Sequence, residues 1–145
     1  MTISEQALIN QGWQLCANVS GFSAFIGPFY QRQEENKQGD AQIIRALPLQ
    51  QHHQNPEGVI HGGVYTAMAD FCIYRAIGDV IGHEVKFATI NLNCDFLAAA
   101  LAEDEVLMGK GKITRLTKSV IFAEGLIYTK RREILRATGI WKILG

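Results

Sequence analysis

One long apolar stretch of helical character sets the strongest limit on what this chain can fold into. Residues 62–77 place Val64, Ala67, Met68 and Phe71 on one helical face, and apolar or small residues cover much of the rest. A helix that is apolar nearly all round has to be buried. The remaining chain must therefore supply enough structure to surround it.

Strand-like stretches lie on both sides of this helix. They are rich in β-branched and aromatic residues and cover 22–33, 41–47, 86–97, 106–117, 120–129 and 134–143. The gaps after the helix are too short for helical crossovers, so the last four strands are predicted to form an antiparallel meander. A short amphipathic helix is predicted over 4–13, capped by Ser4.

These elements predict a single α+β domain over residues 1–145. One helix cannot cover both faces of a six-stranded sheet. The simplest arrangement is a strongly curved antiparallel sheet wrapped around one long central helix. The sheet face and edges left exposed then favour a homodimer.

The composition excludes several classes of protein. Lys plus Arg and Asp plus Glu each total 14, and this zero net charge argues against a nucleic-acid partner. Cys16, Cys72 and Cys94 are widely spaced, which predicts neither a disulfide framework nor a metal site. The segment 1–10 has no signal-peptide pattern, and no apolar run is long enough to span a membrane. We therefore expect a soluble cytoplasmic protein without a membrane partner.

The junction between loop and helix carries the first chemical signal. It reads Asn-Pro-Glu-Gly-Val-Ile-His-Gly-Gly-Val over 55–64. The first N–H groups of a helix lack intrahelical partners, and the helix dipole adds positive charge there. Gly62 and Gly63 let a ligand approach the backbone closely. Such a site can stabilise a developing oxyanion, for example on a thioester carbonyl, although a glycine pair alone is more typical of a tight turn that starts a helix.

Asp70 is the second signal. It is the only ionised residue between His61 and Arg75, on a helix that should be buried. Isolated buried carboxylates are costly, so such residues are usually paired or functional. The structural alternative is a hydrogen bond to Thr66 or Tyr74.

The spacing of these two signals predicts how the site is assembled. Gly63 and Asp70 are separated by ~10 Å along a helix axis, on nearly the same face. A catalytic base must come within roughly 3 Å of the reacting group. One helix cannot easily supply both groups to one thioester, so we predict a composite active site at a two-fold dimer interface.

At these residues the sequence resembles a known family. The pattern Asn-x-x-Gly-x-x-His-Gly-Gly, with Asp nine residues after His, resembles the phenylacetate-degradation type of hotdog-fold acyl-CoA thioesterase, over about residues 20–143. That family has a curved antiparallel sheet around a long helix and forms dimers that often pair into tetramers. The resemblance implies hydrolysis of an acyl-CoA substrate, no metal or redox cofactor, and a homodimer or a dimer of dimers.

The resemblance also implies roles for individual residues. Asp70 would act as general base or nucleophile, and the N–H of Gly62 would polarise the thioester carbonyl. Asn55 would hold the carbonyl or the attacking water, and His61 would shape the loop through hydrogen bonds. Thr89 is the best match to the Ser or Thr that orients the water in this family.

CoA phosphates require cations and donors. The turn 114–119 offers Arg115, Lys118 and Ser119, and the related family uses this region for CoA contacts. Gly63 is expected to lie against the substrate. The segment 130–132 is a second basic candidate, and for each patch an ordinary solvated turn is an equal alternative.

Two other functions stay open from the sequence. One is a non-catalytic acyl-CoA binding or sensing module, and the other is a 3-hydroxyacyl-thioester dehydratase with His61 as general acid. The acyl group is not determined, because Tyr65, Phe71 and Tyr74 could line a pocket or belong to the core. His52 and His53 are expected to be solvated loop residues.

Overall fold

The structure is a computed structural model that describes residues 2–145. Its elements, in chain order, are α1 (Glu5–Asn10), β1 (Gln14–Leu15), α2 (Gly21–Ile26), β2 (Tyr30–Glu35), β3 (Ala41–Pro48), η1 (Gln51–His53), α3 (Gly62–Ile81), β4 (Phe87–Phe96), η2 (Ala102–Asp104), β5 (Val106–Leu116), β6 (Val120–Tyr128) and β7 (Glu133–Ile143). The α+β class is confirmed: one long helix packs on a seven-stranded antiparallel sheet.

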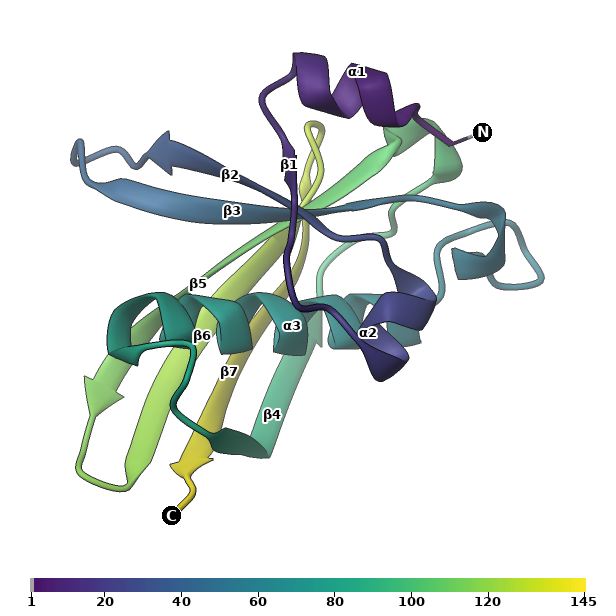
Figure 1. Ribbon diagram of the computed structural model, residues 1–145. Coiled ribbons are helices and arrows are strands. Elements are labelled where there is room, and N and C mark those ends of the chain that lie inside the picture. Colours follow the sequence, from purple (N-terminus) through teal and green to yellow (C-terminus); the bar gives the residue numbers. More distant parts are fainter. Residues whose placement is uncertain (1) are drawn as a thin grey trace.

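The long helix α3 crosses the inner face of the sheet (Figure 1). It runs from Gly62 to Ile81, four residues beyond the predicted end at residue 77. Most of its apolar side chains are buried against the sheet, as the sequence predicts. The main core contains Met68, Cys72, Ile73 and Ile77 of α3.

The strand order is β1-β2-β3-β5-β6-β7-β4, with every neighbouring pair antiparallel. The predicted four-strand meander is therefore only partly right. Strands β5, β6 and β7 form a meander, but β4 lies at the edge beyond β7. The segment 97–105 is long enough to return the chain across the sheet, so β5 pairs with β3 instead of β4.

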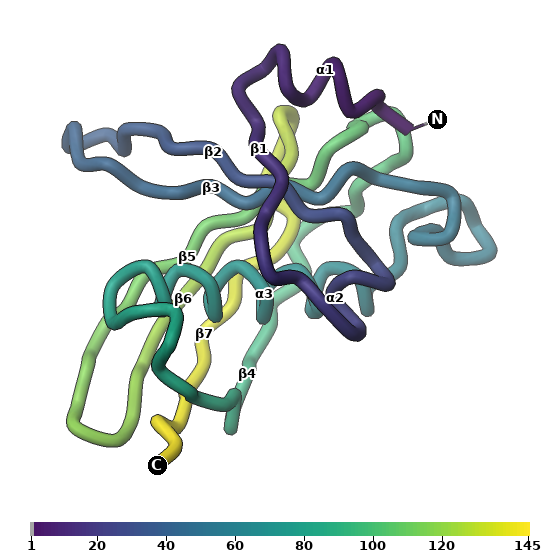
Figure 2. Tube along the Cα trace, viewed as in Figure 1, coloured from purple at the N-terminus to yellow at the C-terminus, as the bar shows by residue number. Residues whose placement is uncertain are grey.

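The β2–β3 hairpin is joined to the rest of the sheet at one end only. β3 pairs with β5 only through residues 45–48 and 106–109. Beyond that contact the hairpin diverges from β5, β6 and β7 (Figure 2). The sheet is thus strongly bent around α3, as the sequence analysis expects of a curved sheet.

The predicted strand over 22–33 is wrong in its first half. Residues Gly21–Ile26 form α2, and β2 begins only at Tyr30. Phe22 and Phe25, which favour a strand on composition, stand on α2 with 66% and 78% of their surface exposed. The first helix is shorter than predicted, although Ser4 Oγ does cap it by accepting from the N–H of Ala7 at 3.1 Å.

Three glycines bring α3 directly onto the sheet backbone. A β-carbon at Gly111 would lie 3.0 Å from the Cα of Ile73, and one at Gly125 would lie 2.7 Å from Ile73 Cγ1. A β-carbon at Gly109 would collide with Cys72 Sγ. Side chains at these positions are thus excluded by the helix itself.

An ion pair joins α3 to β3. Arg45 is only 2% exposed and donates two hydrogen bonds to Asp79, at 2.6 and 3.0 Å. His83 Nε2 lies 2.9 Å from the same carboxylate. The C-terminal half of α3 is therefore fixed to the sheet by charge as well as by packing.

No helix within residues 2–145 combines the length and apolarity needed to cross a lipid bilayer.

Candidate active site

Asp70 lies halfway along α3 and meets the edge strand β4. Thr89 Oγ1 donates a hydrogen bond of 2.6 Å to Asp70 Oδ1. Asp70 is half-buried rather than buried, because β4 is the last strand of the sheet and leaves this side of the helix open. The structural alternative with Thr66 does not occur, since Thr66 Oγ1 donates to the carbonyl of Gly63 at 3.0 Å.

The N-terminus of α3 is capped by His61. Its Nδ1 accepts the N–H of Gly63 at 2.7 Å, so that N–H is already engaged within the chain. The N–H of Gly62, the first residue of the helix, has no acceptor among residues 2–145. Gly62 therefore offers the open donor at the positive end of the helix. Because its N–H is engaged, Gly63 could contact a substrate only by letting it approach a backbone that has no side chain.

The space around the two glycines explains their presence. A β-carbon at Gly63 would lie 2.9 Å from His61 Nδ1, so glycine lets the imidazole fold back onto the helix end. A β-carbon at Gly62 would lie 3.3 Å from the ring of Phe96, the last residue of β4. The helix N-terminus and Asp70 thus border the same edge strand at two different points.

Asn55 organises the loop before the helix. Its Oδ1 accepts the N–H groups of Glu57 and Val59, each at 3.0 Å. The side-chain oxygen is thus committed to the turn. The amide nitrogen of Asn55 forms no hydrogen bond within residues 2–145 and is the part that could reach a substrate.

His53 is buried, so the expectation of a solvated loop residue is wrong. Its Nδ1 accepts the N–H of Gln50 at 3.0 Å, and its Nε2 donates to the carbonyl of Ile26 at 2.7 Å. Its own carbonyl accepts the N–H of His61 at 2.9 Å. Burial lowers the pKa of this imidazole, which favours its neutral form. His53 thereby anchors the loop that carries Asn55 and His61.

Sequence reasoning missed the burial of His53 because its partner, Ile26, is remote in the chain.

The three aromatic candidates for the acyl pocket lie in different surroundings. Tyr65 is buried, and its hydroxyl accepts the N–H of Ala100 at 2.6 Å, so it belongs to the core. Phe71 and Tyr74 border an open hollow next to Asp70.

This hollow has a volume of about 280 Å³ and lies between α3 and the segment that leads into α2. Figure 1 shows α2 beside the N-terminal half of α3. Polar and aromatic side chains dominate its lining, which includes Asn18, Ser20, Ser23, Asp70, Tyr74 and Arg75. The carboxylate therefore has space for a small group beside it.

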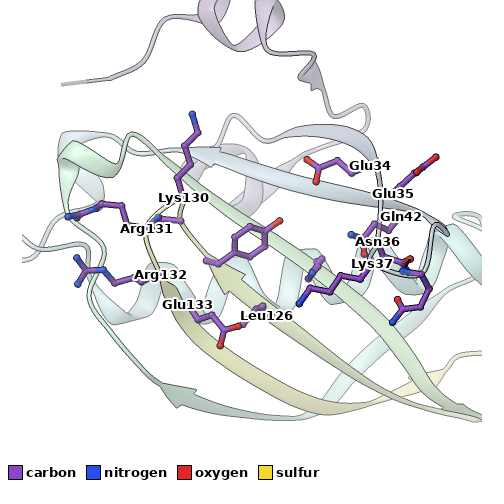
Figure 3. A pocket seen from close by; sticks show the side chains of 14 residues that line it. Glu34, Glu35, Asn36, Lys37, Gln42, Leu126, Lys130, Arg131, Arg132 and Glu133 are labelled. Carbon is purple, nitrogen blue, oxygen red and sulfur yellow. Dashed lines mark hydrogen bonds between the residues drawn. The ribbon is translucent and has the colours of Figure 1, made fainter.

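The predicted CoA contacts lie elsewhere on the molecule. Arg115, Lys118 and Ser119 are exposed around the β5–β6 turn and do not line the hollow beside Asp70. The second basic segment, 130–132, borders a hollow of about 600 Å³ against the tip of the β2–β3 hairpin (Figure 3). Within that segment Arg131 pairs with Asp104, and this hydrogen bond lowers the pKa of the Asp104 carboxyl.

A sequence model of the thioesterase superfamily matches residues 57–135, which is more than half of the chain. The chain belongs to the thioesterase superfamily. The match contains His61, Gly62, Gly63, Asp70 and Thr89. This thioesterase is also similar over nearly its whole length to a protein of Pseudomonas aeruginosa named as an esterase, with 24% identity over 135 residues, 93% of this chain and 97% of the relative.

Solved structures of other thioesterases share the fold. A phenylacetic acid degradation-related thioesterase from Ralstonia eutropha aligns with a TM-score of 0.71 and 20% identity, covering 88% of this chain and 92% of the other. A Bacillus halodurans protein crystallised with CoA aligns with a TM-score of 0.68 and 21% identity, covering 79% and 74%. The hotdog fold and the resemblance drawn from the sequence are confirmed. The superfamily and the esterase-named relative support a hydrolase that acts on thioesters.

Proposed function

We propose that this thioesterase hydrolyses acyl-CoA at a composite site formed by two copies of the chain. The observation that carries the proposal is the hydrogen bond of 2.6 Å between Thr89 and Asp70 beside an open hollow. It orients an ionisable carboxylate at a position that a substrate can reach. The CoA bound to the structural relative from Bacillus halodurans supports CoA as the carrier.

The chemistry needs an oxyanion donor as well as a base. The open N–H of Gly62 can donate to the thioester oxygen as negative charge develops there. Asp70, as base or nucleophile, would act on the opposite side of the carbonyl carbon, with Asn55 holding the carbonyl or the water. As base, Asp70 takes a proton from the water that adds to the carbonyl carbon and returns it to the CoA sulfur as the C–S bond breaks. As nucleophile, Asp70 forms an anhydride as the C–S bond breaks, and the water that hydrolyses the anhydride supplies the proton of the CoA thiol.

Within one chain these two groups are too far apart. Gly62 and Asp70 are separated by ~12 Å along the axis of α3. A second copy can close this distance through β4, an edge strand of ten residues paired on one side only. Ile90 and Phe96 on this strand are exposed apolar residues, which suits an interface.

The two contacts on β4 set the register of such a dimer. Asp70 rests on Thr89 near one end of β4, and Gly62 packs beside Phe96 at the other end. Antiparallel pairing of two β4 strands about an axis near Asn93 would lay Phe96 beside the partner's bulge at 89–90. Gly62 would then approach the partner subunit's Asp70. Two such dimers could pair further into a tetramer.

We assign the binding of CoA to the exposed end of β5 and the turn that follows it. Arg115, Lys118 and Ser119 supply two cations and a hydroxyl for the phosphates. Contacts to the phosphates bind substrate and transition state alike, so Lys118→Ala should raise KM with little change in kcat. A large loss of kcat at constant KM would contradict this assignment.

A thiol-release assay with a panel of acyl-CoAs tests the reaction. Asp70→Asn should abolish release while the protein stays folded by circular dichroism. Binding without release by the wild type would support the sensor, and an enoyl product without release would support the dehydratase. The helix cap occupies Nδ1 of His61, so Nε2 is the ring nitrogen left to act on a substrate in either reaction.

A matched pair of variants tests the oxyanion donor. Gly62→Pro removes the N–H at the first helical position, which proline tolerates well. His61 has φ −62° and ψ 138°, a conformation allowed before proline. Gly62→Ala adds a β-carbon but keeps the N–H. We expect Gly62→Pro to lower kcat by about 10²- to 10³-fold, and Gly62→Ala to lower it far less.

Mixed dimers test whether the site is composite. A heterodimer of one Asp70→Asn subunit and one Gly62→Pro subunit retains one intact site if Asp70 and Gly62 come from different chains. Each homodimer should show at most about one hundredth of the wild-type rate, whereas the purified heterodimer should regain about half of that rate. An inactive heterodimer would place both groups in one chain and overturn the composite site.

A further inference from the structure

The hollow beside Asp70 also contains a cation that the proposed reaction does not use. Arg75 stands on α3 one and a half turns after Asp70 and lines the same space. The carboxylate of Asp70 borders one part of this hollow and the guanidinium of Arg75 borders another. A group that enters beside Asp70 therefore comes within reach of a positive charge.

Arg75 is held in place but is not neutralised. Its Nη2 donates to the carbonyls of Ala17 and Asn18, at 3.0 and 3.2 Å. Its Cζ lies 5.1 Å from the ring centroid of Phe71. Within residues 2–145 the guanidinium forms no ion pair, and Nε and Nη1 donate no hydrogen bond. An anchored guanidinium with unused donors is prepared to bind an anionic oxygen.

The neutral polar side chains of the hollow are also unused by the fold. Ser20 precedes α2 but makes no side-chain cap. Ser23 and Asn18 line the same space, and within the described chain their side chains form no hydrogen bond. Three polar side chains and a cation in one hollow favour a charged or polar group over an alkyl chain. The remaining walls are Val19 and the rings of Phe71 and Tyr74.

We infer that this hollow receives the acyl part of the substrate and that Arg75 selects an acyl group ending in a carboxylate. The inference depends on the proposed hydrolysis, because the thioester has to lie at Asp70. Asp70 and Arg75 are ~7.5 Å apart along the axis of α3, and both line the same hollow, so the proposed substrate carries a dicarboxylic acyl group of about four to six carbons. The terminal carboxylate then binds the fork of Arg75, with Ser20 and Ser23 as additional donors.

Two acyl-CoAs of equal length test this specificity. Glutaryl-CoA and valeryl-CoA both carry five acyl carbons and differ in the terminal carboxylate. The wild type should favour glutaryl-CoA by at least tenfold in kcat/KM, after spontaneous hydrolysis is subtracted. Arg75→Gln should raise the KM for glutaryl-CoA by about 10- to 100-fold and should change the KM for valeryl-CoA far less. Arg75→Lys should fall between the two, since it keeps the charge and loses the fork.

Two controls separate specificity from folding. Arg136→Gln removes an exposed arginine that pairs with Glu133, away from the hollow, and should leave the preference between the two substrates unchanged. Ser23→Ala should weaken glutaryl-CoA selectively but by a smaller factor than Arg75→Gln. Melting temperatures of all variants report whether the segment held by Arg75 has loosened.

The inference is overturned if the wild type prefers valeryl-CoA, or if Arg75→Gln weakens both substrates equally. If no thioester is hydrolysed at all, the proposed function fails by itself. Calorimetric binding of glutaryl-CoA and valeryl-CoA to the wild type and Arg75→Gln then still decides the role of Arg75. Equal affinities of glutaryl-CoA and valeryl-CoA for both proteins would exclude a role of Arg75 in recognising the terminal carboxylate.

Discussion

Thr89 Oγ1 donates its proton to Asp70 Oδ1 across 2.6 Å, and this contact joins the middle of α3 to the edge strand β4. The hydroxyl has one proton, so its remaining capacity is to accept. An attacking water could donate one proton to Thr89 and the other to the second oxygen of Asp70. Thr89 would thus position the carboxylate and the water together.

Replacing Thr89 tests this positioning. Thr89→Val has a similar shape but lacks the hydroxyl, and Thr89→Ser keeps it. A hydrogen bond to a charged group is worth about 1.5–3 kcal/mol, so we expect Thr89→Val to lower kcat by about 10- to 100-fold with little change in KM. Thr89→Ser should stay close to the wild type in steady-state thiol release. A fully active Thr89→Val would exclude the hydroxyl from the reaction.

The cap on α3 should be measurable as stability. His61→Ala removes the acceptor for the N–H of Gly63, and losing an N-cap costs about 1 kcal/mol. His61→Asn restores a short polar acceptor and should recover most of the free energy of unfolding. Urea denaturation of the three proteins measures both effects. Equal destabilisation by Ala and Asn would mean that the imidazole packs rather than caps.

His53 should make stability depend on pH. Burial lowers the pKa of its imidazole in the folded protein, while the unfolded chain keeps a value near ~6.5. As the pH falls through that value, the unfolded state takes up a proton that the folded state refuses, so the free energy of unfolding decreases. A protonated Nδ1 could also no longer accept the N–H of Gln50.

Denaturation between pH 7.5 and 5 checks this sign. The stability difference between wild type and His53→Gln should shrink as the pH falls, because the variant has no imidazole to protonate. His52→Gln is the matched control, because His52 is exposed and is the smallest of the causes that act on the His53 pKa, so the slope should change little. A slope that survives in His53→Gln would assign the effect to other groups.

The pair between Arg45 and Asp79 should contribute strongly to stability. Asp79→Ala leaves a guanidinium that is only 2% exposed without its partner, and breaking a buried pair in this way costs about 3 kcal/mol or more. His83→Gln disturbs only the 54% exposed member of the cluster and should cost less than about 1 kcal/mol. Chemical denaturation compares them, and similar losses in both variants would contradict a buried pair that stabilises the fold.

Much of the fold follows from local patterns in the sequence. The helix that begins at Gly62 and the hairpin partner near Ala41–Pro48 are visible as periodicity and composition. Strand order is not visible in this way, because the pairing of β4 with β7 joins residues far apart in the chain. The exposed Phe22 and Phe25 misled the prediction of the first strand, since aromatic residues favour strands only where they pack on a sheet.

In the candidate site, too, the residues on one local element were predicted and the contacts between distant segments were not. The sequence singles out His61, Gly62 and Asp70 because they follow one another on a single helix with a recognisable spacing. The burial of His53 and the anchoring of Arg75 were not predicted, because their partners, Ile26 and Ala17, come from a distant segment. Local spacing predicts groups on one element, whereas contacts between elements require coordinates.

The glycines beneath α3 have a consequence for the residues above it. Gly109, Gly111 and Gly125 touch neither Asp70 nor Thr89, yet the absence of their side chains lets the helix settle to the depth at which the carboxylate reaches the hydroxyl. A methyl group at any of them would push the helix away from the sheet and lengthen the contact between Asp70 and Thr89. The three glycines thus set how closely α3 packs on the sheet, and through that distance they set the position of Asp70 relative to Thr89.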